Sequence, residues 1–253
     1  MELDYYNCLF VFLRVSAFLL VLPFFSMANF PAVMRVAISV LATILIAPLL
    51  PPFNASGLTF FSLIGLMFQE VSVGLVLGFV SRMVFYAADL AGNIIATELG
   101  LNMGAVFDPL SQQSSQVPGT VLFFLAAVVM LTLDLHHWVL VGFERTYLVL
   151  PIGAAHLNRA LFATVVGDTR DIFVVAIEIA APLLAVSFVV TIVFSVLSRA
   201  VPQMNVFILS FSFRIIGGLA VFGFTLQLTA QYVMNYLHRL PDDLLNLAQL
   251  LGG

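Results

Sequence analysis

The sequence contains few charged residues and no lysine. Only 9% of its 253 residues are charged, all nine basic residues are arginine, and 62% of the residues are hydrophobic. A composition this apolar excludes a soluble globular domain, and a net charge of −4 offers no basic surface for nucleic acid. Arginine tolerates partly buried pairing better than lysine does, so these charges fit between helices. Cys8 is the only cysteine, which excludes an internal disulfide.

The sequence also lacks the motifs of common enzyme classes. It has no Gly-x-x-x-x-Gly-Lys-Ser/Thr loop to bind nucleotide phosphates and no Gly-x-Ser-x-Gly turn to carry a nucleophilic serine. Cys8 has no histidine near it in the sequence that could activate its thiol. The first residues are acidic where a signal peptide is basic, so we expect the first apolar run to remain in the protein. We therefore expect a non-enzymatic protein with no cofactor and no bound metal.

Long uncharged runs dominate what is present. Each reaches or exceeds the roughly 20 residues that a helix needs to cross about 30 Å of hydrocarbon. They cover residues 15–34, 36–69, 179–198 and 215–237. The sequence therefore predicts an all-α integral membrane protein of about six apolar helices, arranged as helical hairpins. Several helices should be kinked, because Pro23, Pro48 and Pro182 lie inside or at the ends of apolar runs. The predicted helices lie near residues 5–27, 32–50, 58–101, 119–148, 170–199 and 204–239.

The arginines do not set the orientation of these predicted helices. With six alternating spans, the positive-inside rule would require most arginines in loops on one side. Instead they divide evenly, with Arg35, Arg82, Arg199 and Arg214 on one side and Arg145, Arg159, Arg170 and Arg239 on the other. Either the helix count differs from six, or partner subunits decide how the chain inserts.

A polar, irregular segment interrupts the apolar sequence between Glu98 and Gly119. Its glycine and proline residues break a helix, and residues 111–116 are serine and glutamine without charge. In a membrane protein, non-helical backbone of this kind is tolerated where protein surrounds it or where it lines a wet cavity. This loop is the first candidate for function.

Polar side chains also form stripes on two predicted helices. At 100° per residue, each stripe lies within an arc of about 80°. A polar stripe in a lipid setting faces other protein or water, so it either packs inside a helix interface or lines a pore. The glycine pairs Gly74/Gly78 and Gly217/Gly218 suggest close helix contacts. The stripes are Arg82, Tyr86, Asp89, Asn93 and Thr97, and Gln227, Gln231, Asn235 and His238.

Two groups of titratable residues have open interpretations. His136 and His137 follow Asp134, but adjacent helical residues point about 100° apart, whereas a chelating pair is spaced i and i+4. We expect hydrogen bonding at the membrane interface or at a helix end, with a metal or proton-relay role as the alternative. Glu70 and Glu178 would suit ion coupling in a transporter, but a helix-end position or an arginine of another chain explains them equally well.

Three sequence blocks resemble one family. The first is Gly-Leu-Asn-Met-Gly-Ala-Val-Phe-Asp-Pro at residues 100–109, followed by the Ser- and Gln-rich loop. The second joins Asp-Leu-His-His at 134–137 to Leu-Pro-Ile-Gly at 150–153, and the third joins Ala-Ala-Pro at 180–182 to Arg-Ala-Val-Pro-Gln-Met-Asn-Val at 199–206. Together they resemble the FliR-type export-gate subunits of bacterial flagella, which are related to the SctT subunit of type III injectisomes. The chain departs from the family pattern at Leu135, where glycine is usual.

This resemblance implies one copy of the chain in a hetero-oligomeric gate in the bacterial inner membrane, within the flagellar basal body. FliP-type, FliQ-type, FlhB-type and FlhA-type subunits would be its partners, and unfolded export substrates would pass through. Residues 1–170 would be a FliP-like part, 171–240 a FliQ-like helical hairpin and 241–253 a short tail. The resemblance also implies a subunit interface at Arg199, Pro202, Gln203, Met204 and Asn205. The implied plug of the central channel comprises Val106, Phe107, Asp108, Pro109, Leu110, Ser111, Gln112, Gln113, Ser114, Ser115 and Gln116.

The leading hypothesis is thus a channel-forming subunit whose polar loop closes the pore at rest. The alternative is a secondary transporter that uses Glu70, Asp89 or Glu178 as its coupling carboxylate. A membrane scaffold without conductance is a third possibility. The leucines of residues 241–253 suit a short amphipathic helix that docks a partner or lies on the membrane.

Overall fold

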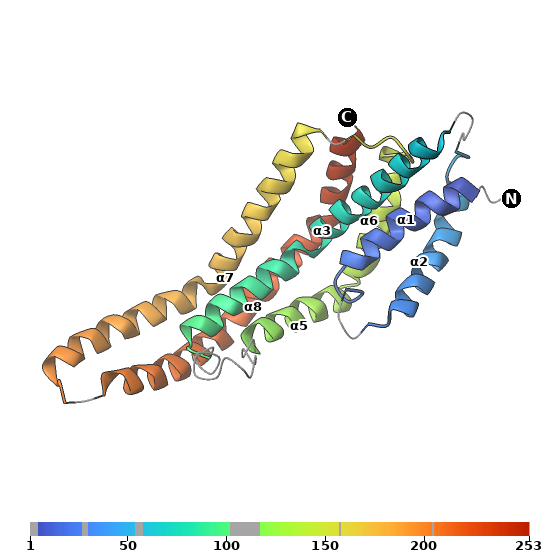
Figure 1. Ribbon diagram of the computed structural model, residues 1–253. Helices are drawn as coiled ribbons and strands as arrows, with labels where there is room; N and C mark the ends of the chain where they lie inside the picture. The colour runs from blue at the N-terminus through green and yellow to red at the C-terminus, as the bar shows by residue number, and fades with distance from the viewer. Residues whose placement is uncertain are drawn as a thin grey trace. The chain divides into compact units, whose positions relative to one another are not determined.

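The computed structural model describes residues 5–26, 30–53, 58–101, 117–156, 158–203 and 205–252, without the side chains of residues 207 and 208. Every regular element in these ranges is helical (Figure 1), which confirms the predicted all-α class. The elements are α1 (Tyr5–Val21), α2 (Ala32–Ile46), the 3-10 turn η1 (Ala47–Leu49), α3 (Phe60–Glu98), α5 (Val117–Thr132), α6 (Leu135–Val149), α7 (Arg159–Ala200) and α8 (Val206–Gly252).

The described helices confirm an integral membrane protein. By length and composition, four helical segments can cross a membrane: Ala32–Leu49, α3, α7 and Leu209–Gly252. The count becomes five if α5 and α6 together form one broken span. Expected and observed helices differ mainly at their ends, and the differences have local physical causes.

One helix expected over residues 119–148 is divided between α5 and α6. The break falls at Leu133 and Asp134, where no proline or glycine marks it. Asp134 adopts the left-handed conformation with φ of 55°. Aspartate is one of the few residues with a side chain that enters this region at modest cost, and the helix starts again at Leu135.

Helices α7 and α8 are longer than expected. α7 begins at Arg159 because the side chain of Asn158 caps it, with the Leu161 N–H donating to Asn158 Oδ1 at 2.7 Å. α8 continues through Pro241 to Gly252, so the short tail is the last part of this helix. α3 is one continuous helix of 39 residues.

The chain folds into two compact units whose segments alternate along the sequence. Unit 1 comprises Met1–Met83, Asp134–Asp168 and Leu237–Gly253, and unit 2 comprises Val84–Leu133 and Thr169–Tyr236. Each unit is therefore assembled from segments that lie far apart in the sequence. The predicted FliP-like and FliQ-like parts concern likeness to other subunits and stay a prediction.

Unit 1 is held together by close packing of α1 on α3. A Cβ added at Gly74 would lie 2.4 Å from the Arg14 carbonyl oxygen, and one at Gly78 would lie 2.9 Å from the Phe18 carbonyl oxygen. The first predicted glycine pair thus makes the expected close helix contact. Phe18 also stacks on Phe143 of α6, with ring centroids 4.2 Å apart.

The end of α8 completes unit 1. Its leucine face is buried, and a Cβ added at Gly142 of α6 would lie 3.1 Å from the Pro241 Cα. The backbone N–H of His156 donates to the Leu251 carbonyl at 2.7 Å. The tail therefore packs against its own chain. This packing buries the leucine face that, from the sequence, was expected to dock a partner or to lie on the membrane. The buried members of this face are Leu240, Leu244, Leu247, Ala248 and Leu251.

Unit 2 has a core of small and branched side chains from four helices. Alanines allow α3 and α7 to lie close together, and larger residues fill the remaining space. Gly218 of α8 lies against Leu99, so one member of the second predicted glycine pair makes a close contact, whereas Gly217 does not. The core consists of Ala88, Ala91, Ile95, Leu99, Leu122, Ala176, Ile179, Ala180, Leu183 and Phe222.

Candidate functional site

The predicted plug, residues 106–116, lies outside the described residues. The structure describes both flanks of the plug, the end of α3 with the turn up to Leu101 and the start of α5 at Val117, and both belong to unit 2. The candidate site is therefore described through the contacts that hold the end of α3 and the start of α5.

The two flanking helices meet at a pair of glycines. A Cβ added at Gly92 of α3 would lie 2.1 Å from the Cα of Gly119 and 3.0 Å from the carbonyl carbon of Pro118. No side chain fits at such a distance, so the two backbones are in direct contact. Pro118 lies in the first turn of α5, where its missing N–H costs no helical hydrogen bond. The start of α5 is thereby fixed against the side of α3.

The other flank ends in a Schellman motif. The Leu101 N–H donates to the Ala96 carbonyl at 2.9 Å, and the Gly100 N–H donates to the Thr97 carbonyl at 3.0 Å. Gly100 supplies the required positive φ, 73°. A Cβ there would lie 2.3 Å from the ring of Phe211 on α8, so glycine is needed for space as well as conformation. The chain leaves α3 at a fixed point and in a fixed direction.

Four residues of the first polar stripe lie on the unit 2 part of α3 and lead toward this end. Asn93 and Thr97 are exposed, and Tyr86 and Asp89 are half-buried. Asn93 Nδ2 donates to the Asp89 carbonyl at 3.0 Å, and Thr97 Oγ1 donates to the Asn93 carbonyl at 2.8 Å. The stripe thus remains on the surface of the described unit. Whether it lines a pore stays a prediction.

Arg82, the fifth residue of that stripe, belongs to unit 1. Its Nη1 donates to Ser26 Oγ at 2.5 Å, and the Val21 carbonyl lies 3.5 Å from the same nitrogen. Arg82 therefore binds the segment that follows α1. The second stripe, on α8, is exposed at all four positions: Gln227, Gln231, Asn235 and His238.

The predicted subunit interface forms the connection between α7 and α8. Arg199, Pro202, Gln203 and Asn205 are exposed there, whereas Met204 lies outside the described residues. Their exposure leaves this connection accessible to another subunit. The interface itself stays a prediction.

A buried ion pair in unit 1 was missed by the sequence reasoning. Arg14 Nε lies 2.6 Å from Glu70 Oε2, and both side chains are 0% exposed. Arg14 Nη1 donates to the Leu150 carbonyl at 3.0 Å, and the Gly153 N–H donates to Glu70 Oε1 at 2.9 Å. The Arg14 guanidinium also lies 4.3 Å from the ring centroid of Tyr147. Glu70 is thus neutralised within its own chain. The sequence contains one signal that could have indicated this ion pair: an arginine in one apolar helix and a glutamate in the apolar part of another.

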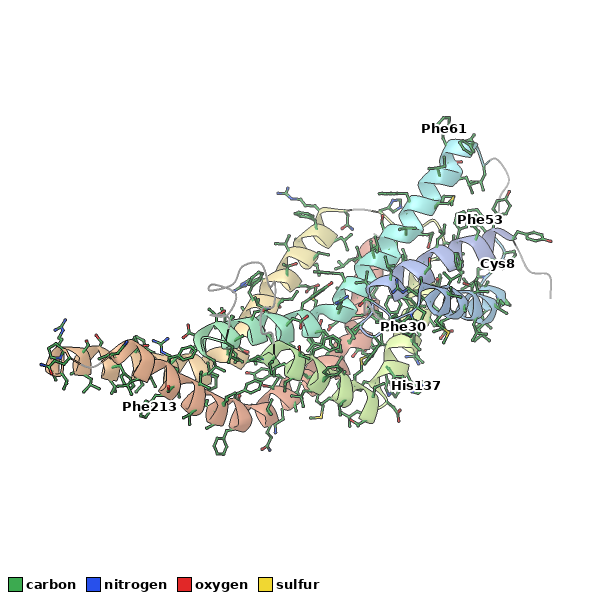
Figure 2. The ribbon with its side chains drawn as sticks, turned by 60° about the horizontal axis from the view of Figure 1, so that its bottom comes forward. Cys8, Phe30, Phe53, Phe61, His137 and Phe213 are labelled. Atoms are coloured by element: carbon green, nitrogen blue, oxygen red, sulfur yellow. The ribbon has the colours of Figure 1, made fainter. Side chains whose placement is uncertain are left out.

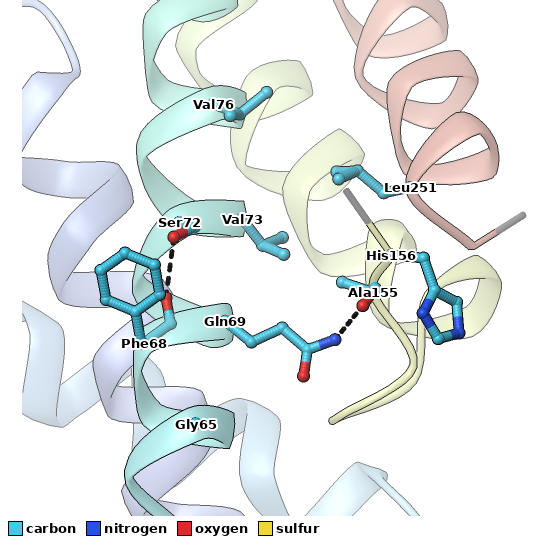
Figure 3. A pocket seen from close by; sticks show the side chains of 9 residues that line it. All are labelled: Gly65, Phe68, Gln69, Ser72, Val73, Val76, Ala155, His156 and Leu251. Carbon is cyan, nitrogen blue, oxygen red and sulfur yellow. Dashed lines mark hydrogen bonds between the residues drawn. The ribbon is translucent and has the colours of Figure 1, made fainter. Parts of the chain in front are cut away.

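The structure also contains a cavity of about 250 Å³ in unit 1 (Figure 3). It lies between one face of α3, from Gly65 to Val76, and the segment that includes Ala155 and His156. Gln69 Nε2 donates to the Ala155 carbonyl across it, and Ser72 Oγ donates to the Phe68 carbonyl at 2.8 Å. These polar donors are engaged within the chain, so the cavity is mainly a gap in helix packing.

The histidine pair departs from the expected geometry. One potential ligand atom from each of Asp134, His136 and His137 lies within 4.8 Å of the others. Although adjacent helical residues point about 100° apart, the two rings come together in the first turn of α6, with centroids 4.1 Å apart. The expected hydrogen-bonding role of the pair stays a prediction.

Comparison with known proteins identifies relatives over most of the chain. The family described as "Bacterial export proteins, family 1" matches residues 5–240. The flagellar biosynthetic protein FliR of Escherichia coli K12 is 28% identical over 87% of this chain and 84% of its own length. The FliR protein of Bacillus subtilis 168 is 28% identical over 96% of this chain and 95% of its own length. The FliR protein of Pectobacterium carotovorum is 26% identical over 92% and 90%, respectively.

Proposed function

Because this chain belongs to family 1 of the bacterial export proteins, we propose that it is a channel-forming and gating subunit of the flagellar type III protein export apparatus. It is a FliR-type membrane component of that apparatus. In the proposed mechanism, unfolded export substrates pass along a conduit that residues 106–116 close at rest.

The observation that carries this proposal is the anchoring of the loop at both ends. The Gly92–Gly119 contact fixes its exit, and the Schellman motif at Gly100 fixes its entry. Residues 102–116, which include the proposed plug, lie between these two fixed points.

The composition of the loop suits a reversible seal. Serine and glutamine side chains form hydrogen bonds with neighbouring backbone but carry no charge that would attract or repel a passing polypeptide. Residues 111–116 contain only these two types. Gating is then a shift of the loop between a packed and an open state.

The exposed apolar surface supports assembly with other subunits. In the most apolar 18 residues of each candidate span, Ala32–Leu49, α3, α7 and Leu209–Gly252, only 17% to 33% of the residues are buried. Figure 2 shows Phe61 and Phe213 projecting away from the chain, and they are 84% and 58% exposed. We assign this surface to lipid and to FliP-type, FliQ-type, FlhB-type and FlhA-type subunits. The proposed complex holds one copy of this chain in the inner membrane, at the flagellar basal body.

Deletion of residues 110–116 tests the plug. In assembled complexes, the deletion should raise ion leakage across the membrane, because the segment that fills the conduit is shortened while both anchors remain. Leakage is measured as conductance in planar bilayers or as dissipation of a membrane potential in vesicles. Glu144→Gln, on the exposed surface of α6, is the control. Unchanged conductance in correctly assembled deletion complexes would exclude the plug.

The contacts of Glu70 argue against its use as the coupling carboxylate of a transporter. Glu70 is held by Arg14 and by the Gly153 N–H, so it is not a free coupling carboxylate. Glu178 is exposed and lies beside Tyr232 of α8. A transporter would show substrate-dependent ion flux when the purified chain alone is placed in vesicles, whereas a gate subunit would be inert without its partners.

A further inference from the structure

We propose that Asp134, His136 and His137 form a binding site for a divalent transition-metal ion, with Zn²⁺ as its natural class of occupant. The three residues stand at the start of α6, all within unit 1. Two imidazoles and one carboxylate form the donor set. This site does not depend on the plug or on the proposed gating mechanism.

The local backbone brings the three donors together. Asp134 precedes α6 in the left-handed conformation, with φ of 55° and ψ of 20°, and its side chain makes no capping hydrogen bond. The usual structural use of an aspartate at this position is therefore absent. Instead, Asp134 Oδ1 lies 3.7 Å from His137 Nδ1. The carboxylate is thus directed toward the histidines and away from the helix backbone.

His136, the other histidine of the cluster, has a ring nitrogen that no described residue engages. His136 Nδ1 is buried, and among the described residues no hydrogen-bond partner serves it. A buried nitrogen without a partner carries a free-energy cost that a metal or a proton donor would remove. The imidazoles of His136 and His137 lie 4.1 Å apart between centroids, with an interplanar angle of 37°.

Small side-chain rotations complete the site. The three potential ligand atoms lie within 4.8 Å of one another, whereas donors around a tetrahedral Zn²⁺ lie roughly 3.4 Å apart. The side chains of Asp134 and His137 are 75% and 68% exposed, so both can rotate without disturbing the core. Figure 2 shows His137 projecting outward from α6.

The donor types select the kind of ion. Imidazole nitrogens favour zinc and its first-row neighbours over magnesium and calcium, which prefer oxygen ligands only. Three protein ligands leave a fourth position of a tetrahedral site for water or for a side chain of another subunit. The exposed position of Asp134 and His137 keeps that fourth position accessible.

Zinc titration of the full chain in detergent tests the site. With ZnCl₂ as the ligand in isothermal titration calorimetry, we expect saturable binding of one ion per chain. Asp134→Asn and His137→Gln should each weaken binding by about tenfold or more, because a site with three protein ligands loses one of them. Zinc should also raise the melting temperature of the unsubstituted chain but not that of these variants. His136→Gln should behave in the same way.

Two controls use the remaining histidines. His156→Gln and His238→Gln should bind zinc as the unsubstituted chain does, since both are exposed and stand outside the cluster. Because His136 is partly buried, the result for His136→Gln counts only if that variant folds. If it does not fold, the variants at the exposed residues Asp134 and His137 test the site. Absence of saturable binding, or equal binding by the Asp134 and His137 variants, would overturn the proposal. Equal weakening by His156→Gln or His238→Gln would do so too.

Discussion

At the scale of single residues, the Arg14–Glu70 pair dominates the electrostatics of unit 1. Removing both charges from water has a large desolvation cost, which their attraction offsets only with good geometry and further hydrogen bonds. The two atoms lie 2.6 Å apart, and the Leu150 carbonyl and Gly153 N–H each bond a further atom of the pair, whereas Arg14 Nη2 has no hydrogen-bond partner among the described residues. The pair joins α1 and α3 to the connection after α6.

Glu70→Gln should destabilise unit 1 strongly. The amide can still accept a hydrogen bond from the Gly153 N–H, but the buried guanidinium of Arg14 loses its counter-charge. Loss of one partner of a buried pair costs about 3–5 kcal/mol of unfolding free energy. Thermal and SDS-induced unfolding of the purified protein measure the change.

Two further variants make that measurement specific. Glu144→Gln removes an exposed carboxylate from the same unit and should change the free energy of unfolding by less than about 0.5 kcal/mol. Replacing both Arg14 and Glu70 by methionine should restore much of the loss, since no buried charge remains unpaired. If the double variant is as unstable as Glu70→Gln, the uncompensated charge is not the cause.

The sequence indicated this pair only in part. It marked Glu70 as an unusual carboxylate and left an arginine of another chain as one explanation. The partner is Arg14 of the same chain, 56 residues away. Pattern and spacing describe one helix at a time, so they do not reveal which face of α1 meets which face of α3.

At the scale of helices, the Gly92–Gly119 contact decides how closely α3 and α5 approach. Gly92→Ala should separate the two backbones, because the new methyl would overlap the Gly119 Cα. Such overpacking costs about 1–3 kcal/mol. Unfolding of the purified protein, monitored by circular dichroism, measures the loss of stability.

A second glycine of unit 2 serves as a matched control for this prediction. A Cβ at Gly217 of α8 meets no atom of the described residues within 4 Å. Gly217→Ala should therefore leave stability unchanged or raise it by up to about 1 kcal/mol through helix propensity. If Gly92→Ala and Gly217→Ala destabilise the protein equally, the close contact with α5 is not the reason why glycine is needed at position 92.

Helix ends were predictable where a side chain or a glycine marks them. Asn158 is a recognisable N-cap that the prediction overlooked, and Gly100 is a recognisable C-terminal glycine close to the expected end at residue 101. The break at Asp134 has no such marker, and Pro241 marks an end that tertiary packing overrides. Sequence reasoning therefore found the helices and the flanks of the loop but could not describe contacts between them.

At the scale of the whole molecule, the exposed apolar surface makes the chain dependent on its surroundings. Side chains such as Phe61 and Phe224 are 84% and 85% exposed. Lipid can cover such groups within the bilayer, but any part of the chain outside it needs protein. This requirement is the physical reason to expect a hetero-oligomer.

Partner dependence is measurable in cells. Without the FliP-type and FliQ-type subunits, we expect the chain to be degraded several-fold faster, because its apolar surface stays accessible to proteases and chaperones. Pulse-chase labelling with and without the partner genes measures its half-life. The same chain carrying Glu144→Gln should respond identically. A half-life that does not change would contradict the assignment to an obligate complex.

The alternation of the two units along the sequence has a consequence for biosynthesis. The Leu251 carbonyl accepts the His156 N–H in a unit that also buries Glu70. At about 5–20 residues per second, the ribosome needs roughly 10–35 seconds to travel from codon 70 to codon 251. For that interval the first membrane helices exist without the segment that completes their packing. We expect insertion factors or neighbouring subunits to cover these helices until the last turn of α8 has been synthesised.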